Sequence, residues 1–266
     1  MTTTNNSFQT RRSDVVDQHN TSDPYRWLEN SESDEVREWI GHQKTLTTTT
    51  LENCDGIQQF KEQLTAFDQY DKFCTPLCVV GTFFQLRKNT GEKQFSVYRM
   101  TSASGENISL LVSGNELLSG SETNPDDEIA INAFEISDNG EMIAYAVSRN
   151  GSDWIEIKIR NVNSLEDYPE TITNARFTEI TWFGNDGFFY CKYPSSVRGI
   201  GDIETEVAKN QMLYYHKMGT DGDDDILIYH DPENEDYLFE TIVTGDQKTL
   251  IIKVVNGCNP NNKVFL

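Results

Sequence analysis

The sequence predicts a mostly β fold built from propeller blades, preceded by a short helical segment. Helical periodicity stops after Tyr70, and short β-type runs separated by Gly/Asp turns follow it. Three similar segments each contain a turn followed by an apolar strand. Their turn glycines are Gly140, Gly187 and Gly245, and successive glycines are separated by 47 and 58 residues. A period of about 40–50 residues with insertions is typical of four-stranded propeller blades, whereas a sandwich needs no such repeat. Chance recurrence of Asp-Gly hairpins is the alternative.

The helical segment is predicted from its turns and its apolar spacing. Residues 1–22 are polar and are expected to form an extended arm, and Pro24 forces Asp23 out of helical geometry. Two helices are expected to follow. The first is capped by Ser33 or Asp34 and weakened at its end by the threonine run 47–50, and the second covers residues 53–67 with Asn53 or Asp55 as its cap.

The β region is predicted from alternating or buried apolar runs between turn clusters. The expected strands are Cys78–Leu86, Phe95–Met100, Ser109–Val112, Met142–Ser148, Trp154–Arg160, Glu179–Phe183, Phe188–Lys192, Met212–Lys217, Ile226–Tyr229, Phe239–Val243 and Thr249–Val255. Residues 264–266 are expected to start a further strand, and such an apolar end is typical of a fragment.

Charge and composition exclude several classes of partner. The chain has 266 residues and a formal net charge of −21, so it repels nucleic acid and anionic membranes at long range. No segment reaches the roughly 18 apolar residues of a membrane span, and the N-terminus lacks the apolar region of a secretory signal. Five cysteines are an odd, sparse set that fits a reducing compartment, so we expect a cytoplasmic protein.

No catalytic or metal-binding pattern is present in the sequence. There is no Gly-x-Ser-x-Gly nucleophile elbow and no phosphate-binding loop. We expect the four histidines (His19, His42, His216 and His230) to be solvated or core residues, not general bases. Cys74 and Cys78 lack a second ligand pair for zinc, and the acidic runs 126–128 and 223–225 lack the spacing of a calcium loop. We therefore expect no metal and no catalytic residue in this chain.

Several motifs, in order along the chain, resemble the prolyl oligopeptidase family. They are Val15-Val16-Asp17 with Asp23-Pro24-Tyr25-Arg26-Trp27-Leu28-Glu29; 134–145 with Gly151-Ser152-Asp153-Trp154; Arg176-Phe177 through Thr181-Trp182 and Phe189-Tyr190 to Tyr193-Pro194; Leu213-Tyr214-Tyr215-His216 with Gly219-Thr220; and Gly257-Cys258-Asn259-Pro260. One short motif would carry little weight, but five in the family's order indicate membership.

The resemblance implies a domain organisation and a function. Residues 1–70 would be a short helical segment of an α/β-hydrolase peptidase domain, and residues 71–266 would form an incomplete seven-bladed propeller, with about four of the blades, that gates the active site. The family is cytosolic, needs no metal or organic cofactor, and cleaves short peptides after proline. Its Ser, Asp and His lie in the later hydrolase part, which would be this chain's intramolecular partner.

The resemblance also places a peptide subsite on this chain. A Phe and a Cys of the family's propeller line an apolar pocket, and the motifs put these roles on Phe177 and Cys258. A family Met between them is Leu238 here, a substitution that conserves volume. The family often has an Arg where this chain has Val255, so one polar anchor is missing. Ordinary packing in the blade core is the alternative role for Phe177 and Cys258.

Two functions therefore compete. In the first, the chain is the propeller portion of a prolyl oligopeptidase-like serine endopeptidase. In the second, it is a non-catalytic partial propeller that acts as a peptide-binding or interaction module. A Gly-x-Ser-x-Gly segment in the coding sequence downstream would distinguish the first from the second.

Overall fold

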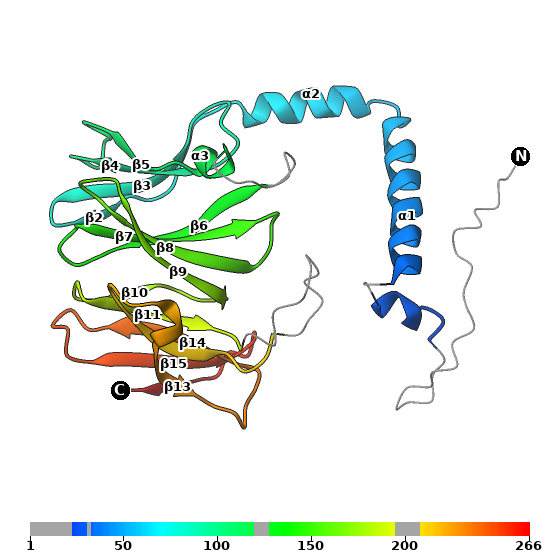
Figure 1. Ribbon diagram of the computed structural model, residues 1–266. Coiled ribbons are helices and arrows are strands. Elements are labelled where there is room, and N and C mark those ends of the chain that lie inside the picture. Colours follow the sequence, from blue (N-terminus) through cyan, green and yellow to red (C-terminus); the bar gives the residue numbers. More distant parts are fainter. Residues whose placement is uncertain (1–22, 31–32, 120–127, 195–207) are drawn as a thin grey trace, which may run out of the picture. The chain divides into compact units, whose positions relative to one another are not determined.

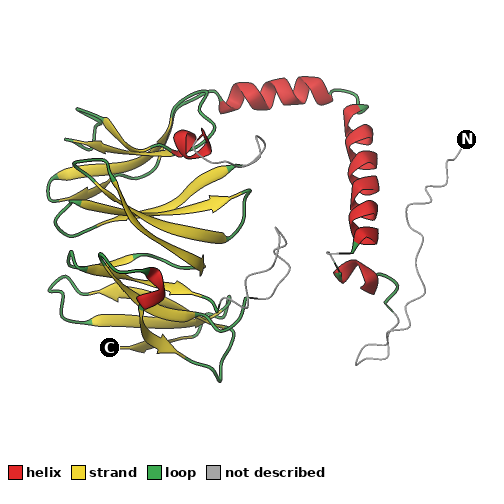
Figure 2. Ribbon diagram, in the orientation of Figure 1, coloured by secondary structure: helices red, strands yellow, loops and turns green. Residues whose placement is uncertain are grey.

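The computed structural model describes residues 23–30, 33–119, 128–194 and 208–266, and the expected arm at 1–22 lies outside them. The chain divides into two compact units, Met1–Gln69 and Tyr70–Leu266 (Figure 1). The first unit is helical in its described part and the second is almost entirely β (Figure 2). Within the described residues, no helix combines the length and the apolar character needed to cross a membrane.

The first helices form where the sequence predicts them. Pro24 precedes a short 3₁₀ helix, η2 (Arg26–Glu29), and α1 (Asp34–Glu52) begins after Ser33. The Ser33 hydroxyl accepts a hydrogen bond from the Val36 N–H at 3.2 Å, which confirms Ser33 as the cap. The threonine run remains within α1, and the Thr50 hydroxyl donates to the Leu46 carbonyl at 2.7 Å, a bond that a helical backbone accommodates.

The expected cap of the second helix is wrong. Asn53 closes α1, and α2 (Ile57–Asp68) begins after Gly56, whose φ of 80° lies in the left-handed region. Glycine adopts this left-handed backbone conformation at little steric cost, so Gly56 allows the chain to turn before α2. No side chain caps the helix.

The β unit consists of four successive antiparallel blades. The first blade holds β1 (Lys72–Phe73), β2 (Leu77–Val79), β3 (Thr82–Lys88), β4 (Ser96–Met100) and β5 (Ser109–Val112). The second blade holds β6 (Ile129–Ile136), β7 (Met142–Arg149), β8 (Trp154–Asn161) and β9 (Asp167–Arg176). The third blade holds β10 (Thr181–Phe183), β11 (Gly187–Lys192), β12 (Met212–Lys217) and β13 (Ile226–His230), and the fourth holds β14 (Tyr237–Val243), β15 (Leu250–Asn256) and β16 (Asn262–Phe265). The second and third blades are joined by a single pair, Lys192 with Ala175. The prediction of a partial propeller with about four blades is confirmed.

Several elements differ from the prediction. The expected strand 78–86 is wrong, since Val80 and Gly81 both have positive φ and form a two-residue hairpin between β2 and β3. The sequence analysis missed β6 and β9, because a bulge interrupts the alternation of β6 and Pro169 with several polar residues disguises β9. It also missed the short helix α3 (Gly114–Ser119).

The hydrophobic core lies between blades, in three layers. The first layer joins blades one and two through Phe84, Leu111, Ile131 and Tyr145, among others. The second joins blades two and three, and the third joins blades three and four around Phe239. Each blade is therefore stabilised mainly by its neighbours in sequence.

The two ends of the blades differ in their connections. At one end, β5, β7, β9 and β11 finish and β6, β8, β12 and β14 begin. The two longest connections, 113–128 and 193–211, both leave from this end. We call it the long-loop end; the connections at the opposite end are shorter turns.

Candidate functional site

All three residues predicted for the peptide subsite lie at the long-loop end. Phe177 directly follows β9, Leu238 is the second residue of β14, and Cys258 lies two residues beyond the end of β15. They come from two neighbouring parts of the propeller, the junction of blades two and three and the hairpin of blade four.

Phe177 is held in an unusual conformation beside a buried cation. Its φ of 50° is in the left-handed region, and its side chain is 52% exposed, so it is not part of the blade core. The Arg176 guanidinium lies 4.6 Å from the Phe177 ring centroid and 5.3 Å from that of Trp154. Asp153 accepts a hydrogen bond from Arg176 at 3.0 Å, so the cation is fixed in place.

Gln211 joins Phe177 to the start of β14. Its side-chain nitrogen donates to the carbonyls of Arg176 at 3.1 Å and Phe177 at 3.0 Å. Its side-chain oxygen accepts from the Phe239 N–H at 2.8 Å, and the residue is almost fully buried. Sequence reasoning missed Gln211, because a single Gln before an apolar strand carries no recognisable signal.

Leu238 and Cys258 occupy the hairpin of blade four. Leu238 is half-buried, lies on the face of the hairpin that points away from blade three, and is paired with Val255 on β15. Cys258 is exposed in the turn that closes with the Asn259 N–H donating to the Asn256 carbonyl at 3.0 Å. The structure therefore links Phe177 to β14 through Gln211, and it connects Cys258 to Leu238 through the hairpin backbone.

A pocket of about 550 Å³ opens along the inner strands β6, β10 and β14, starting from the residue after Phe177. Threonine hydroxyls bridge two of these strands: Thr181 Oγ1 donates to the Thr241 carbonyl at 3.1 Å, and Thr241 Oγ1 donates to Thr181 Oγ1 at 2.8 Å. The Trp182 indole donates to the Glu135 carbonyl at 3.2 Å and connects β10 to β6. These hydrogen bonds tie the three strands of the pocket wall together, and the wall contains both polar and apolar side chains.

The wall of this pocket is also acidic. Glu135, Asp138 and Glu179 line it. Burial, together with the negative charge of Glu179, raises the pKa of Glu135 above its ordinary value. The charged form of Glu135 is therefore disfavoured in the folded state.

Glu135→Gln is expected to stabilise the chain at neutral pH. Because the folded-state pKa of Glu135 is raised, the charged carboxylate destabilises the fold above that pKa, and this penalty disappears as the pH falls below the ordinary Glu pKa. Thermal melts from pH 4 to 8 should therefore show a variant whose advantage over the parent grows with pH. The exposed Glu166→Gln is the control, and an advantage independent of pH would contradict the assignment.

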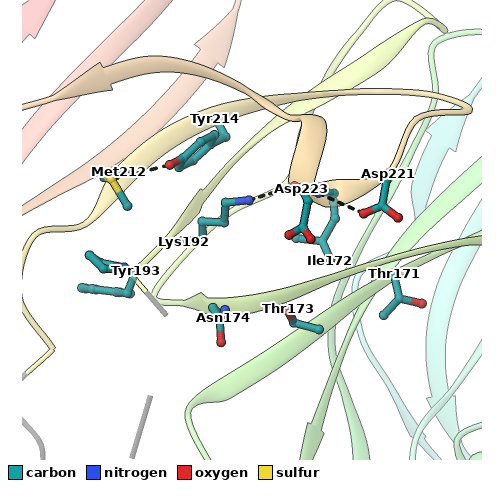
Figure 3. Close-up of a pocket in the computed structure, with 12 residues that line it drawn as sticks. Thr171, Ile172, Thr173, Asn174, Lys192, Tyr193, Met212, Tyr214, Asp221 and Asp223 are labelled. Atoms are coloured by element: carbon teal, nitrogen blue, oxygen red, sulfur yellow. Dashed lines mark hydrogen bonds between the residues drawn. The ribbon is translucent and has the colours of Figure 1, made fainter. Parts of the chain in front are cut away.

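A second pocket, of about 250 Å³, lies beside β9 and β12 and contains none of the predicted subsite residues (Figure 3). Lys192 crosses it, donates to the Gly222 carbonyl at 3.0 Å, and lies 4.4 Å from the Tyr214 ring centroid. Lys192 is already engaged by these partners, so it is not a free cation for a ligand.

The described histidines are placed in the ways expected of non-catalytic residues. His216 is completely buried, with Nδ1 2.8 Å from an oxygen of Asp225, and its imidazole cannot reach a substrate. His42 is exposed on α1, His230 is half-buried, and His19 lies outside the described residues. No group of three or more His, Cys, Asp or Glu side chains suited to a metal ion occurs in the part of the chain that the structure describes. All five cysteines lie within that part and are free thiols.

Comparison with known proteins identifies the family. A family model described as the prolyl oligopeptidase N-terminal β-propeller domain matches residues 6–266. Prolyl oligopeptidase A of Galerina marginata is 30% identical over 282 residues, which cover 96% of this chain and 38% of that protein. The prolyl endopeptidase of Elizabethkingia meningoseptica is 28% identical over 240 residues, covering 90% of this chain and 33% of that protein.

A solved structure gives the same result in three dimensions. Prolyl oligopeptidase B from Galerina marginata, bound to a 25mer macrocyclization substrate, matches with a TM-score of 0.78 and 26% identity, over 96% of this chain and 38% of that chain. This chain therefore spans little more than a third of the length of these relatives. From its match over nearly the whole sequence and from its blades, the chain belongs to the prolyl oligopeptidase family and corresponds to its N-terminal β-propeller domain.

Proposed function

We propose that the chain is the N-terminal and propeller portion of a serine endopeptidase that cleaves short peptides after proline. In this proposal the propeller restricts access to the active site. The Ser, Asp and His that carry out hydrolysis belong to a hydrolase domain that is not part of these 266 residues, and residues 1–70 pack with that domain. The match of the family model to residues 6–266 is the observation that carries the proposal.

Phe177, Leu238 and Cys258 are the proposed contribution of the propeller to peptide binding. An exposed aromatic ring at the long-loop end offers an apolar surface, and Leu238 and Cys258 at the same end are also apolar. The exposure of Phe177 supports this role over the alternative of core packing, since a core phenylalanine would be buried. The Arg176 stack and the Gln211 bridge hold the ring in position.

Phe177→Ala in an enzyme that carries this chain together with its hydrolase domain tests the proposal. Burying a substrate side chain on the ring contributes roughly 1–2 kcal/mol, so the variant should raise KM by about 5- to 30-fold for peptides with a bulky residue upstream of proline. A minimal proline substrate should be almost unaffected.

Phe183→Ala is the matched control, because this partly exposed aromatic lies at the opposite end of β10. An equal rise in KM for bulky and minimal substrates would contradict the subsite. If the chain's coding sequence continued without a Gly-x-Ser-x-Gly segment, the peptidase assignment itself would be wrong.

A further inference from the structure

A separate pocket of about 260 Å³ lies between the first and second blades, where α3 faces β7 and β8. Its apolar wall is formed by Val112, Leu117, Ile129 and Val147. All four are at least half-buried. Ile129 and Val147 share one face of the second blade, whereas Val112 ends β5 of the first blade and Leu117 lies on α3. The pocket shares no residue with the inner-strand pocket or with the predicted peptide subsite.

Three cations of the second blade also line this pocket, on the same face of the sheet as Ile129 and Val147: Arg149, Lys158 and Arg160. Arg160 is committed to Asp167, with two contacts of 2.7 and 2.9 Å, and to the Leu111 carbonyl at 2.9 Å. Among the described residues, Arg149 and Lys158 have no hydrogen-bond or ion-pair partner, and Arg149 Nη1 is buried. Such a pair is unexpected in a chain with a net charge of −21, where carboxylates are abundant.

The charges of the pocket leave room for one negative charge. Glu116 also lines it, and Asp167 pairs with Arg160 and attracts Lys158, so among the charged side chains that the structure describes here three cations face two carboxylates. A single anion restores neutrality, whereas a phosphate monoester with a charge near −2 would exceed it. A guanidinium binds a carboxylate through paired hydrogen bonds, and the adjacent apolar wall suits a short aliphatic group.

We propose that this pocket binds a small organic monocarboxylate with an aliphatic body. Arg149 and Lys158 hold the carboxylate, and the wall of Val112, Leu117, Ile129 and Val147 covers the aliphatic group. Two sources share this chemistry: a free branched-chain acid, and the C-terminal carboxylate of a short peptide that ends on an aliphatic residue. The site is independent of the proposed peptidase function.

Methyl NMR of the full chain tests the proposal directly. Titration with 4-methylpentanoate should shift the methyl signals of Val112, Ile129 and Val147, and 4-methylpentanamide should bind about tenfold more weakly because it lacks the charge. Inorganic phosphate should bind more weakly than the carboxylate. The dipeptide Gly-Leu, compared with its C-terminal amide, distinguishes a peptide source from a free acid.

Charge variants should move the affinity in both directions. Arg149→Gln should weaken 4-methylpentanoate binding about tenfold, and Lys158→Gln should weaken it several-fold. Glu116→Gln should strengthen binding about threefold, because it removes a competing carboxylate. Lys217→Gln and Glu106→Gln make the same charge changes at exposed positions outside the pocket and should leave the affinity unchanged.

Three results would overturn the site: methyl shifts confined to other residues, unchanged affinity in both folded cation variants, or phosphate binding that exceeds carboxylate binding. Methyl spectra of each variant establish that it is folded. Because Glu116→Gln is expected to tighten binding, loss of structure cannot mimic its effect.

Discussion

Asp225→Ala is expected to cost about 3–5 kcal/mol in the free energy of unfolding, because it leaves buried partners without a hydrogen bond. The side chains of Asp225 and His216 are both fully buried and lie 2.8 Å apart. The other Asp225 oxygen accepts from the Tyr190 hydroxyl. Burial, reinforced by Asp225, raises the pKa of Tyr190, so its phenol remains a donor. Urea unfolding measures the loss, with the exposed neighbour Asp223→Ala as the control.

A double variant separates the network from simple packing. His216 packs against Phe188, with ring centroids 5.2 Å apart, so His216→Phe combined with Asp225→Leu replaces the polar pair by apolar groups. This double variant should be at least about 2 kcal/mol more stable than Asp225→Leu alone, because it leaves fewer buried polar atoms unpaired. If the losses in the free energy of unfolding caused by His216→Phe and Asp225→Leu simply added up in the double variant, the two side chains would not be coupled.

Gln211→Ala is expected to cost about 2–4 kcal/mol, and it should also release Phe177. The substitution removes the partners of two carbonyls and of the Phe239 N–H, and each unsatisfied buried group costs about 1–3 kcal/mol. The midpoint of urea unfolding reports the loss of stability. The aromatic NMR signals of Phe177 and the methyl signals of Leu238 should both shift, because Gln211 bonds to the Phe177 carbonyl and to the N–H of Phe239, the residue after Leu238.

Gln59→Ala is the control for that experiment, since Gln59 is exposed on α2. If Gln211→Ala unfolded at the same urea concentration as Gln59→Ala, the bridge would not stabilise the junction. If Phe177 signals alone shifted, Gln211 would position the ring without coupling it to β14.

The sequence was sufficient to recognise the blades, although not every strand in them, because the pattern of a buried strand after a glycine turn is local. A strand such as β7 is almost wholly buried and apolar, and Gly140 marks the turn before it with a φ of 76°. The helix caps and the outer strands were harder to predict, because their residues show no distinctive pattern in the sequence. Ser33 caps α1 as predicted, whereas α2 begins after Gly56 by backbone geometry alone. The outer strand β9 is polar on one face and contains Pro169, so its pattern is that of a loop.

The candidate site was predictable only in part, since it is assembled from distant segments. Phe177, Leu238 and Cys258 were located by resemblance, and the structure puts them at one end of the blades. Their supports depend on contacts between distant residues: Gln211 bonds to residues 28 to 35 positions away, and Arg176 stacks on Trp154, 22 positions earlier in the chain. Similarly, Arg149 and Lys158 belong to different strands, and no local pattern shows that neither has a hydrogen-bond or ion-pair partner in the described part of the chain.

The layered core has a consequence for the order of events during synthesis. Each layer needs side chains from two successive blades, as in the contact of Trp182 with the Glu135 carbonyl. At about 5–20 residues per second, a ribosome needs roughly 3–10 s to add the next blade of about 50 residues. During that interval the newest blade has one apolar face exposed to solvent. The nascent chain therefore passes through a series of intermediates, one per blade, that are prone to aggregation through this face. Binding of a chaperone to ribosome-bound chains should therefore rise and fall once per blade.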